Sequence, residues 1–195
     1  PVGRLDEAIA ALGVDMALRT AMALALDITS SLLDERLIER AGLYLATAEQ
    51  VATIARAMAL SIGLDGLSCY TAGLLSRGGE LAVLRTLQDF IARGGDIGNA
   101  DIEALIAQWS PQYGNRLKQQ WGLPLPVREL VGAIHMAPTH ATQRPLLIMH
   151  LAGLRVASRL NGPEALRILR QSGLDVEKWQ PKTEAVADGV PEGKT

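Results

Sequence analysis

The stretch between Asp34 and Leu60 constrains the fold most, because its apolar residues recur at helical spacing along two neighbouring lines. The first line contains Leu37, Ala41, Leu45, Ala48, Ala52, Ala55 and Ala59, and the second contains Tyr44, Val51, Ile54 and Met58. A helix that is apolar over so wide an arc, and rich in alanine, packs closely on more than one side. The charged residues at its start include pairs at i, i+4 and predict a solvated face. They are Glu35, Arg36, Glu39 and Arg40.

The composition favours packed helices throughout the chain. Of its 195 residues, 48% are hydrophobic but only 4% are aromatic, whereas sandwiches and barrels are richer in β-branched and aromatic residues. The formal net charge of −2 provides no basic surface for nucleic acid. No apolar run reaches the ~18 residues of a membrane span. The single cysteine, Cys69, cannot form an internal disulfide, which fits a reducing cytoplasm, and we expect it to be buried.

Caps and breaks divide the remaining chain into further predicted helices. Helices are expected over 5–12, from Asp15 through Met22 and Leu26, over 67–75, over 81–93, from Asn99, from Pro111, over 127–135, over 145–160 and over 163–172, with a last turn over 174–179. Residues 72–81 predict a glycine-broken turn between two helices. Ser110 is expected to cap the helix that Pro111 opens. Trp109, Tyr113 and Trp121 are expected in the core, with Gly114 allowing a close helix approach.

Three stretches taken in order resemble the HDOD domain, a helical bacterial signalling module related to the HD phosphohydrolases. They are residues 5–13 (LDEAIAALG), residues 72–75 (AGLL) with the glycines that follow, and residues 113–124, which include Tyr113-Gly114 and Gln120-Trp121-Gly122-Leu123-Pro124. The resemblance covers roughly residues 5–161. It implies an all-α, compact multi-helix bundle that lacks the family's N-terminal helices. The expected domain is 1–180, with its core at about 5–161 and C-terminal helices at 163–180, followed by a flexible polar tail at 181–195.

In the related HD enzymes a His-Asp pair follows the segment that matches Ala72-Gly73-Leu74-Leu75, and further histidines complete a metal site. Here that pair is replaced by Ser76-Arg77, and arginine cannot ligate a divalent cation. The other positions implied by the resemblance fall at Ala46 or Thr47, at Ser110, and near Ala137-Pro138. The resemblance therefore implies no catalytic residue, no metal and no cofactor. The histidines present, His135, His140 and His150, are read as ordinary surface or loop residues.

Two interpretations of Arg77 remain open. With Ser76 and the backbone N–H groups of Gly78 and Gly79, it would contact an anion if the glycines open the following helix. Alternatively, Arg77 pairs with Glu80 or another acid while the glycines turn the chain.

The resemblance implies a non-catalytic regulatory domain in the cytoplasm, acting as the C-terminal output module of a bacterial two-component response regulator. Its expected partners are an upstream sensory or receiver domain of a longer chain and an unidentified protein, with no nucleic acid and no membrane. Self-association into a homo-oligomer is left open. The alternatives are a metal-dependent HD-type phosphohydrolase or phosphodiesterase, and a nucleotide-sensing pocket without hydrolysis.

Overall fold

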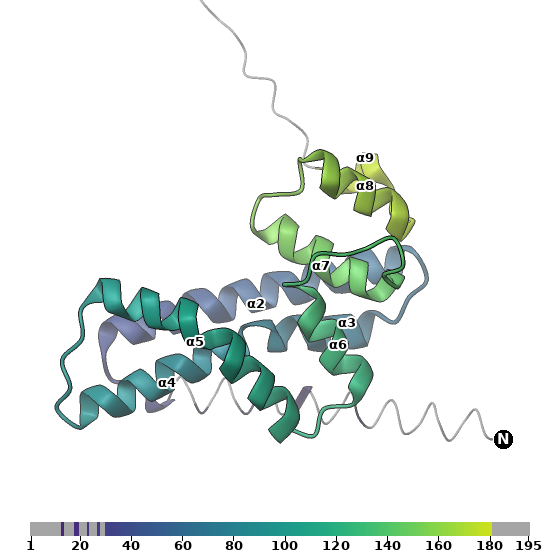
Figure 1. The fold of residues 1–195 in the computed structure, drawn as a ribbon. Helices are drawn as coiled ribbons and strands as arrows, with labels where there is room; N and C mark the ends of the chain where they lie inside the picture. Colours follow the sequence, from purple (N-terminus) through teal and green to yellow (C-terminus); the bar gives the residue numbers. More distant parts are fainter. Residues whose placement is uncertain (1–12, 14–17, 20–22, 24–26, 28–29, 181–195) are drawn as a thin grey trace, which may run out of the picture.

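The computed structural model describes residues 13, 18, 19, 23, 27 and 30–180. Within this part of the chain the fold is all-α, as predicted, and contains no strand. The elements, shown in Figure 1, are α2 (Glu35–Ser61), α3 (Gly66–Leu74), the short 3-10 helix η1 (Leu75–Arg77), α4 (Gly78–Ala92), α5 (Asn99–Gln120), α6 (Leu125–Ala133), α7 (Arg144–Val156), α8 (Pro163–Ser172) and α9 (Val176–Trp179). The helix predicted over 5–12, the predicted cap Asp15 with Met22 and Leu26, and the polar tail from Pro181 lie outside the described residues.

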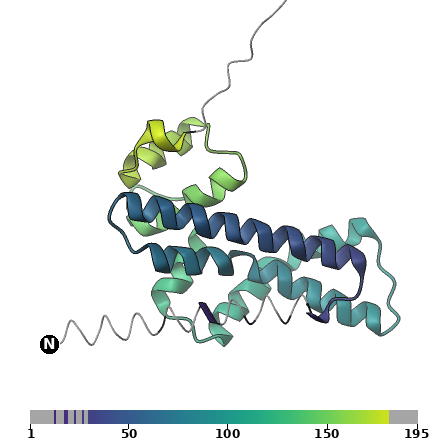
Figure 2. The ribbon, with the colours of Figure 1, turned by 180° about the vertical axis from the view of Figure 1, so that it is seen from behind.

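The helix α2 occupies the stretch that the two apolar lines predict. It begins after Asp34, whose carboxylate accepts a hydrogen bond from the backbone N–H of Arg36 at 2.9 Å. It ends before Gly63, which has a positive φ of 72°. The buried residues of α2 are Leu37, Ala41, Ala48, Val51, Ala52, Ala55, Met58 and Ala59. Figure 2, seen from behind, shows α2 in front of the other helices, running along the length of the bundle.

Two hydrophobic clusters form the core, and α2 contributes to both. The larger cluster joins the C-terminal half of α2 to α3, α6, α7 and α8 through residues such as Met58, Leu147 and Ile168. The smaller cluster joins the N-terminal half of α2 to α4 and α5 through residues such as Leu37 and Leu84. The wide apolar arc of α2 is therefore explained by neighbours on more than one side.

The charged start of α2 is only partly solvated. Glu35 and Glu39 are exposed, as predicted. Arg36, however, pairs with Asp34 at 2.8 Å and donates to the backbone carbonyl of Ile97 at 2.8 Å. The Arg36 guanidinium also lowers the pKa of the Asp34 carboxyl. The arginines at the start of α2 thus bond to groups on its cap and on distant segments instead of forming the predicted i, i+4 pairs.

A long-range contact anchors the start of α2. The side chain of Gln88 on α4 is buried, and its Oε1 accepts hydrogen bonds from the backbone N–H groups of Leu33 and Asp34 at 2.8 and 3.0 Å. These donors precede the helix and lack an intrahelical acceptor. Gln88 therefore ties α4 to the N-terminal end of α2.

The glycine pair after η1 does not form the predicted turn. Gly78 has a helical φ of −59° and ψ of −33°, and both Gly78 and Gly79 are buried in the first turn of α4. A Cβ atom on Gly79 would lie 2.3 Å from the carbonyl oxygen of Ser110 on α5. These glycines are therefore needed for close helix packing, and the expectation of a glycine-broken turn was wrong.

The helix α5 runs through Ser110-Pro111, so the predicted boundary there was also wrong. Asn99, which the sequence predicts as the cap of this helix, is instead its first residue, and the cap is Gly98. The Ser110 hydroxyl donates to the carbonyl of Ile106 at 2.6 Å instead of capping a helix. The helix continues because its contacts with α4 extend to both sides of Pro111, including the predicted close approach of Gly114, which lies against Gly79.

The aromatic residues of α5 are less buried than predicted. Trp109 is 39% exposed, while Tyr113 and Trp121 are half-buried against the core clusters. The face of α5 towards α4 includes Ile106 and Ser110. At ~100° per residue, Trp109 points well away from Ser110, which explains why the prediction for Trp109 was wrong.

The C-terminal helices agree with their sequence signals. Pro145 and Pro163 lie in the first turns of α7 and α8, and α8 ends at Gly173 with a left-handed φ of 83°. Across the ranges that the structure describes, no helix has the length and apolar content needed to cross a bilayer.

Candidate ligand-binding cavity

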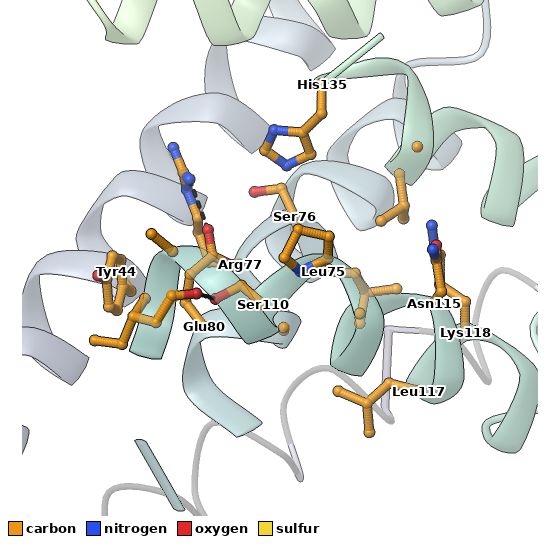
Figure 3. A pocket seen from close by; sticks show the side chains of 18 of the residues that line it. Tyr44, Leu75, Ser76, Arg77, Glu80, Ser110, Asn115, Leu117, Lys118 and His135 are labelled. Carbon is orange, nitrogen blue, oxygen red and sulfur yellow. Dashed lines mark hydrogen bonds and ion pairs between the residues drawn. The ribbon is translucent and has the colours of Figure 1, made fainter. Parts of the chain in front are cut away.

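A cavity of about 660 Å³ lies between α2, the junction of η1 with α4, α5, and the end of α6. Figure 3 shows it from close by. Its wall contains Tyr44 and Ile106, which belong to or pack on the smaller core cluster, and Leu75 and Val131 of the larger cluster. The cavity is therefore located where the two parts of the core meet.

The structure brings the candidate site residues of the sequence together at this cavity. Ser76, Arg77, Gly78, Gly79 and Ser110 all line it. The other positions that the resemblance implied for metal ligands, Ala46, Thr47, Ala137 and Pro138, are not part of its wall. Tyr44 lines it from α2 instead, and His135 and Met136 line it from the segment after α6.

The hydroxyl of Ser76 is buried without a hydrogen-bond partner. Ser76 is 6% exposed, and its Oγ atom bonds to no group in the described part of the chain. Figure 3 shows this hydroxyl on the side of the cavity that faces His135. Because buried hydroxyls are nearly always paired, the unpaired hydroxyl of Ser76 is an unusual feature of the wall.

Arg77 pairs with Glu80, as the second interpretation of this residue predicted. Its Nη1 atom lies 2.8 Å from the carboxylate of Glu80, one turn along the chain. Its Nε atom is buried and has no hydrogen-bond partner among the residues described. The ion pair therefore uses only part of the guanidinium, and the anion contact stays a prediction.

The glycine amides are less available than the sequence suggested. The N–H of Gly78 donates to the carbonyl of Leu75 at the end of η1. A Cβ atom on Gly78 would lie 3.3 Å from the ring of Trp121, so this glycine also serves packing. Any anion in the cavity would depend mainly on side-chain donors.

Sequence reasoning did not identify Lys118 and His135 as parts of the cavity. Lys118 is half-buried on α5 and, within the described ranges, forms no ion pair; its burial lowers the pKa of its ammonium group. Lys118 lies eight residues after Ser110, so the i, i+4, i+8 row of α5 could have indicated it. His135 is exposed, and no local pattern marks it, because its position depends on how α6 packs.

The carboxylates of the wall are both paired with arginines. Glu80 bonds to Arg77, and Glu103 bonds to Arg40 of α2 at 2.6 Å. Lys118 therefore adds a positive charge that these carboxylates do not balance.

The remaining candidates for metal or nucleophile chemistry are scattered. No group of three His, Cys, Asp or Glu residues close enough to hold a metal ion occurs in the ranges described. His150 lies on α7, where burial lowers its pKa, and His140 lies in an exposed loop. Cys69 is buried in the larger core cluster, as predicted, and burial raises the pKa of its thiol to about 12.

A comparison with protein families finds one match. The model of the HDOD domain matches residues 1–137, which is more than half of the chain and ends before the C-terminal limit of about residue 161 that the motifs suggested. Neither the curated proteins nor the solved structures gave a match. HDOD domains are related to HD domains and are associated with signalling. The motifs, the all-α bundle and this match together show that the chain belongs to the HDOD domain family.

Proposed function

We propose that this chain is a non-catalytic regulatory domain that acts through protein contacts, as the C-terminal output module of a bacterial two-component response regulator. The observation that carries this proposal is the pair Ser76-Arg77 at the cavity, with Arg77 held by Glu80 at 2.8 Å. A hydroxyl and a paired guanidinium occupy the place where an HD-type enzyme needs an imidazole and a carboxylate. Metal-assisted hydrolysis requires a cation to polarise phosphate and activate water, and these groups do not supply its ligands.

The proposed partners are an upstream sensory or receiver domain and a further protein. An upstream domain would change its state and thereby expose or mask a helical surface. Exposed apolar side chains on α2, such as Ile38 and Leu43, support a contact on this helix because they lie outside the core. The module would need no cofactor and would function in the cytoplasm.

Addition of Mn²⁺ or Fe²⁺ is expected to produce no hydrolysis of nucleotides or of phosphodiesters such as bis-p-nitrophenyl phosphate. Product release should equal that of buffer with metal, and the purified chain should retain less than one metal ion after dialysis. Stoichiometric metal with turnover that EDTA abolishes would instead establish the HD-type phosphohydrolase or phosphodiesterase. A catalytically active HD enzyme assayed in parallel shows that the conditions support turnover.

Amide hydrogen exchange tests the contact part of the proposal in the longer protein that would carry this module. We expect exchange in α2 to be about tenfold slower in one signalling state of that protein than in the isolated chain, because docking suppresses local opening. The helix α8 lies away from α4 and α5 in Figure 1 and serves as the internal control. Equal exchange of α2 in both signalling states and in the isolated chain would contradict a contact on this helix.

A further inference from the structure

Two donor atoms at the cavity have no acceptor within the described part of the protein. One is Oγ of Ser76, a buried residue with an exposed fraction of only 6%. The other is Nε of Arg77. Donors and acceptors buried without partners are few in folded proteins, and each one indicates a missing water, ion or ligand. Because both residues line the same cavity, a small shift of each side chain would bring its donor atom to a group bound there.

The ion pair with Glu80 holds the Arg77 guanidinium in position and leaves some of its N–H donors available for such a ligand. It holds Nη1 at 2.8 Å from the carboxylate and leaves Nε unused. A guanidinium is a planar array of donors that matches the oxygens of a phosphate or carboxylate. Glu80 therefore fixes the guanidinium without occupying all of its donors.

Lys118 supplies positive charge from another wall of the cavity. In Figure 3 it lies on α5, across from the Arg77 side of the cavity. It has no acidic partner among the described residues, while Glu103 is bonded to Arg40. The lowered pKa of Lys118, caused by its burial, agrees with an ammonium group that lacks a counter-charge. A bound anion would provide that charge.

The size and the apolar walls of the cavity indicate an organic anion. Small-molecule sites have volumes of ~300–1,000 Å³ and mainly apolar walls with a few polar groups, and this cavity measures about 660 Å³. Leu117 and Trp121 contribute apolar surface on the side of Lys118. An inorganic ion would contact the donors but would not reach these apolar side chains.

We propose that the cavity binds a small organic phosphomonoester of about mononucleotide size. Its phosphate would lie beside Ser76 and Arg77, and its organic part would extend across the cavity towards Leu117 and Trp121, on the side where the ammonium group of Lys118 adds positive charge. The domain would thereby respond to a phosphorylated metabolite. This binding goes beyond the proposed function and does not rest on it, since a ligand can occupy the cavity whether or not the domain contacts another protein.

The test is calorimetric titration of the full chain with two phosphomonoesters, phenyl phosphate and AMP, and with adenosine and inorganic phosphate as comparisons. We expect at least one phosphomonoester to bind about tenfold or more tightly than both comparisons, since only it contacts the donors and the apolar wall together. Absence of binding by both phosphomonoesters would overturn the proposal. Equal affinity of adenosine would overturn the phosphate contact, and equal affinity of inorganic phosphate would overturn the organic contact.

Two variants locate the site. Ser76→Ala and Lys118→Gln should each weaken phosphomonoester binding by about tenfold, because each removes a hydrogen bond or charge at an ionised group. The matched substitutions Ser61→Ala and Lys178→Gln, at exposed positions outside the cavity wall, should leave binding unchanged. Ser76→Ala removes an unpaired buried hydroxyl and is expected to fold, which circular dichroism checks. Unchanged affinity in both cavity variants would overturn this location.

Discussion

Replacing Gly73 by alanine is expected to lower the free energy of unfolding by about 3 kcal/mol or more. Gly73 is buried on α3, where α3 packs against α2. A Cβ atom at this position would lie 2.3 Å from Cα and 2.6 Å from the backbone nitrogen of Ala52. Since these are main-chain atoms in the middle of a long helix, no side-chain rotation relieves the overlap, and α2 and α3 must separate. Urea denaturation monitored by circular dichroism measures the loss.

Gly42→Ala is the matched control for this substitution. Gly42 lies within α2, is exposed, and has no atom within 4 Å of the Cβ that alanine would add. Here alanine should raise the free energy of unfolding by about 0.5–1 kcal/mol, because it restricts the unfolded chain and favours helix. If Gly73→Ala were as harmless as Gly42→Ala, the close approach of α2 and α3 would be wrong.

Replacing Leu37 by alanine is expected to cost about 2–5 kcal/mol of stability. The side chain of Leu37 is 0% exposed and packs in the smaller core cluster with residues of α4 and α5. Its removal leaves a cavity that the helices around it fill only in part. The same denaturation experiment measures the loss.

Leu43→Ala provides the comparison for Leu37→Ala on the same helix. Leu43 is 62% exposed, so its truncation should change the free energy of unfolding by no more than about 0.5 kcal/mol. The same residue type in the same helix isolates burial as the cause of the difference. Similar losses in both variants would mean that the smaller cluster does not form around this face of α2.

The helices that carry strong local signals could be predicted from the sequence. The cap Asp34 and the apolar lines locate α2, and Pro163 and Gly173 mark the two ends of α8. These signals are local, since a cap, a proline or a left-handed glycine acts on the turn in which it lies. Pro111 misled the prediction because a proline signal can be overridden by packing, which here continues on both sides of it.

The candidate site could be predicted only in part. The resemblance identified Ser76, Arg77 and Ser110, and all of them line the cavity. Lys118 and His135 were missed, because they reach the cavity through the packing of α5 and α6 against η1 and α4. The motifs therefore indicated one part of the wall. The positions of Lys118 and His135 in the wall depend on contacts between segments that are distant in the sequence.

By itself, the sequence determined the helical class, the course of α2 and the position of Ser76-Arg77 directly after the Ala72-Gly73-Leu74-Leu75 motif. Only the tertiary structure decided that Gly79 allows α5 to approach α4, that Arg40 pairs with Glu103, and that Ser76 keeps a buried hydroxyl without a partner. The physical reason is the separation along the chain of the residues that interact. Helix formation depends on residues within a few positions of one another, whereas burial and pairing depend on side chains that meet only after the helices have packed.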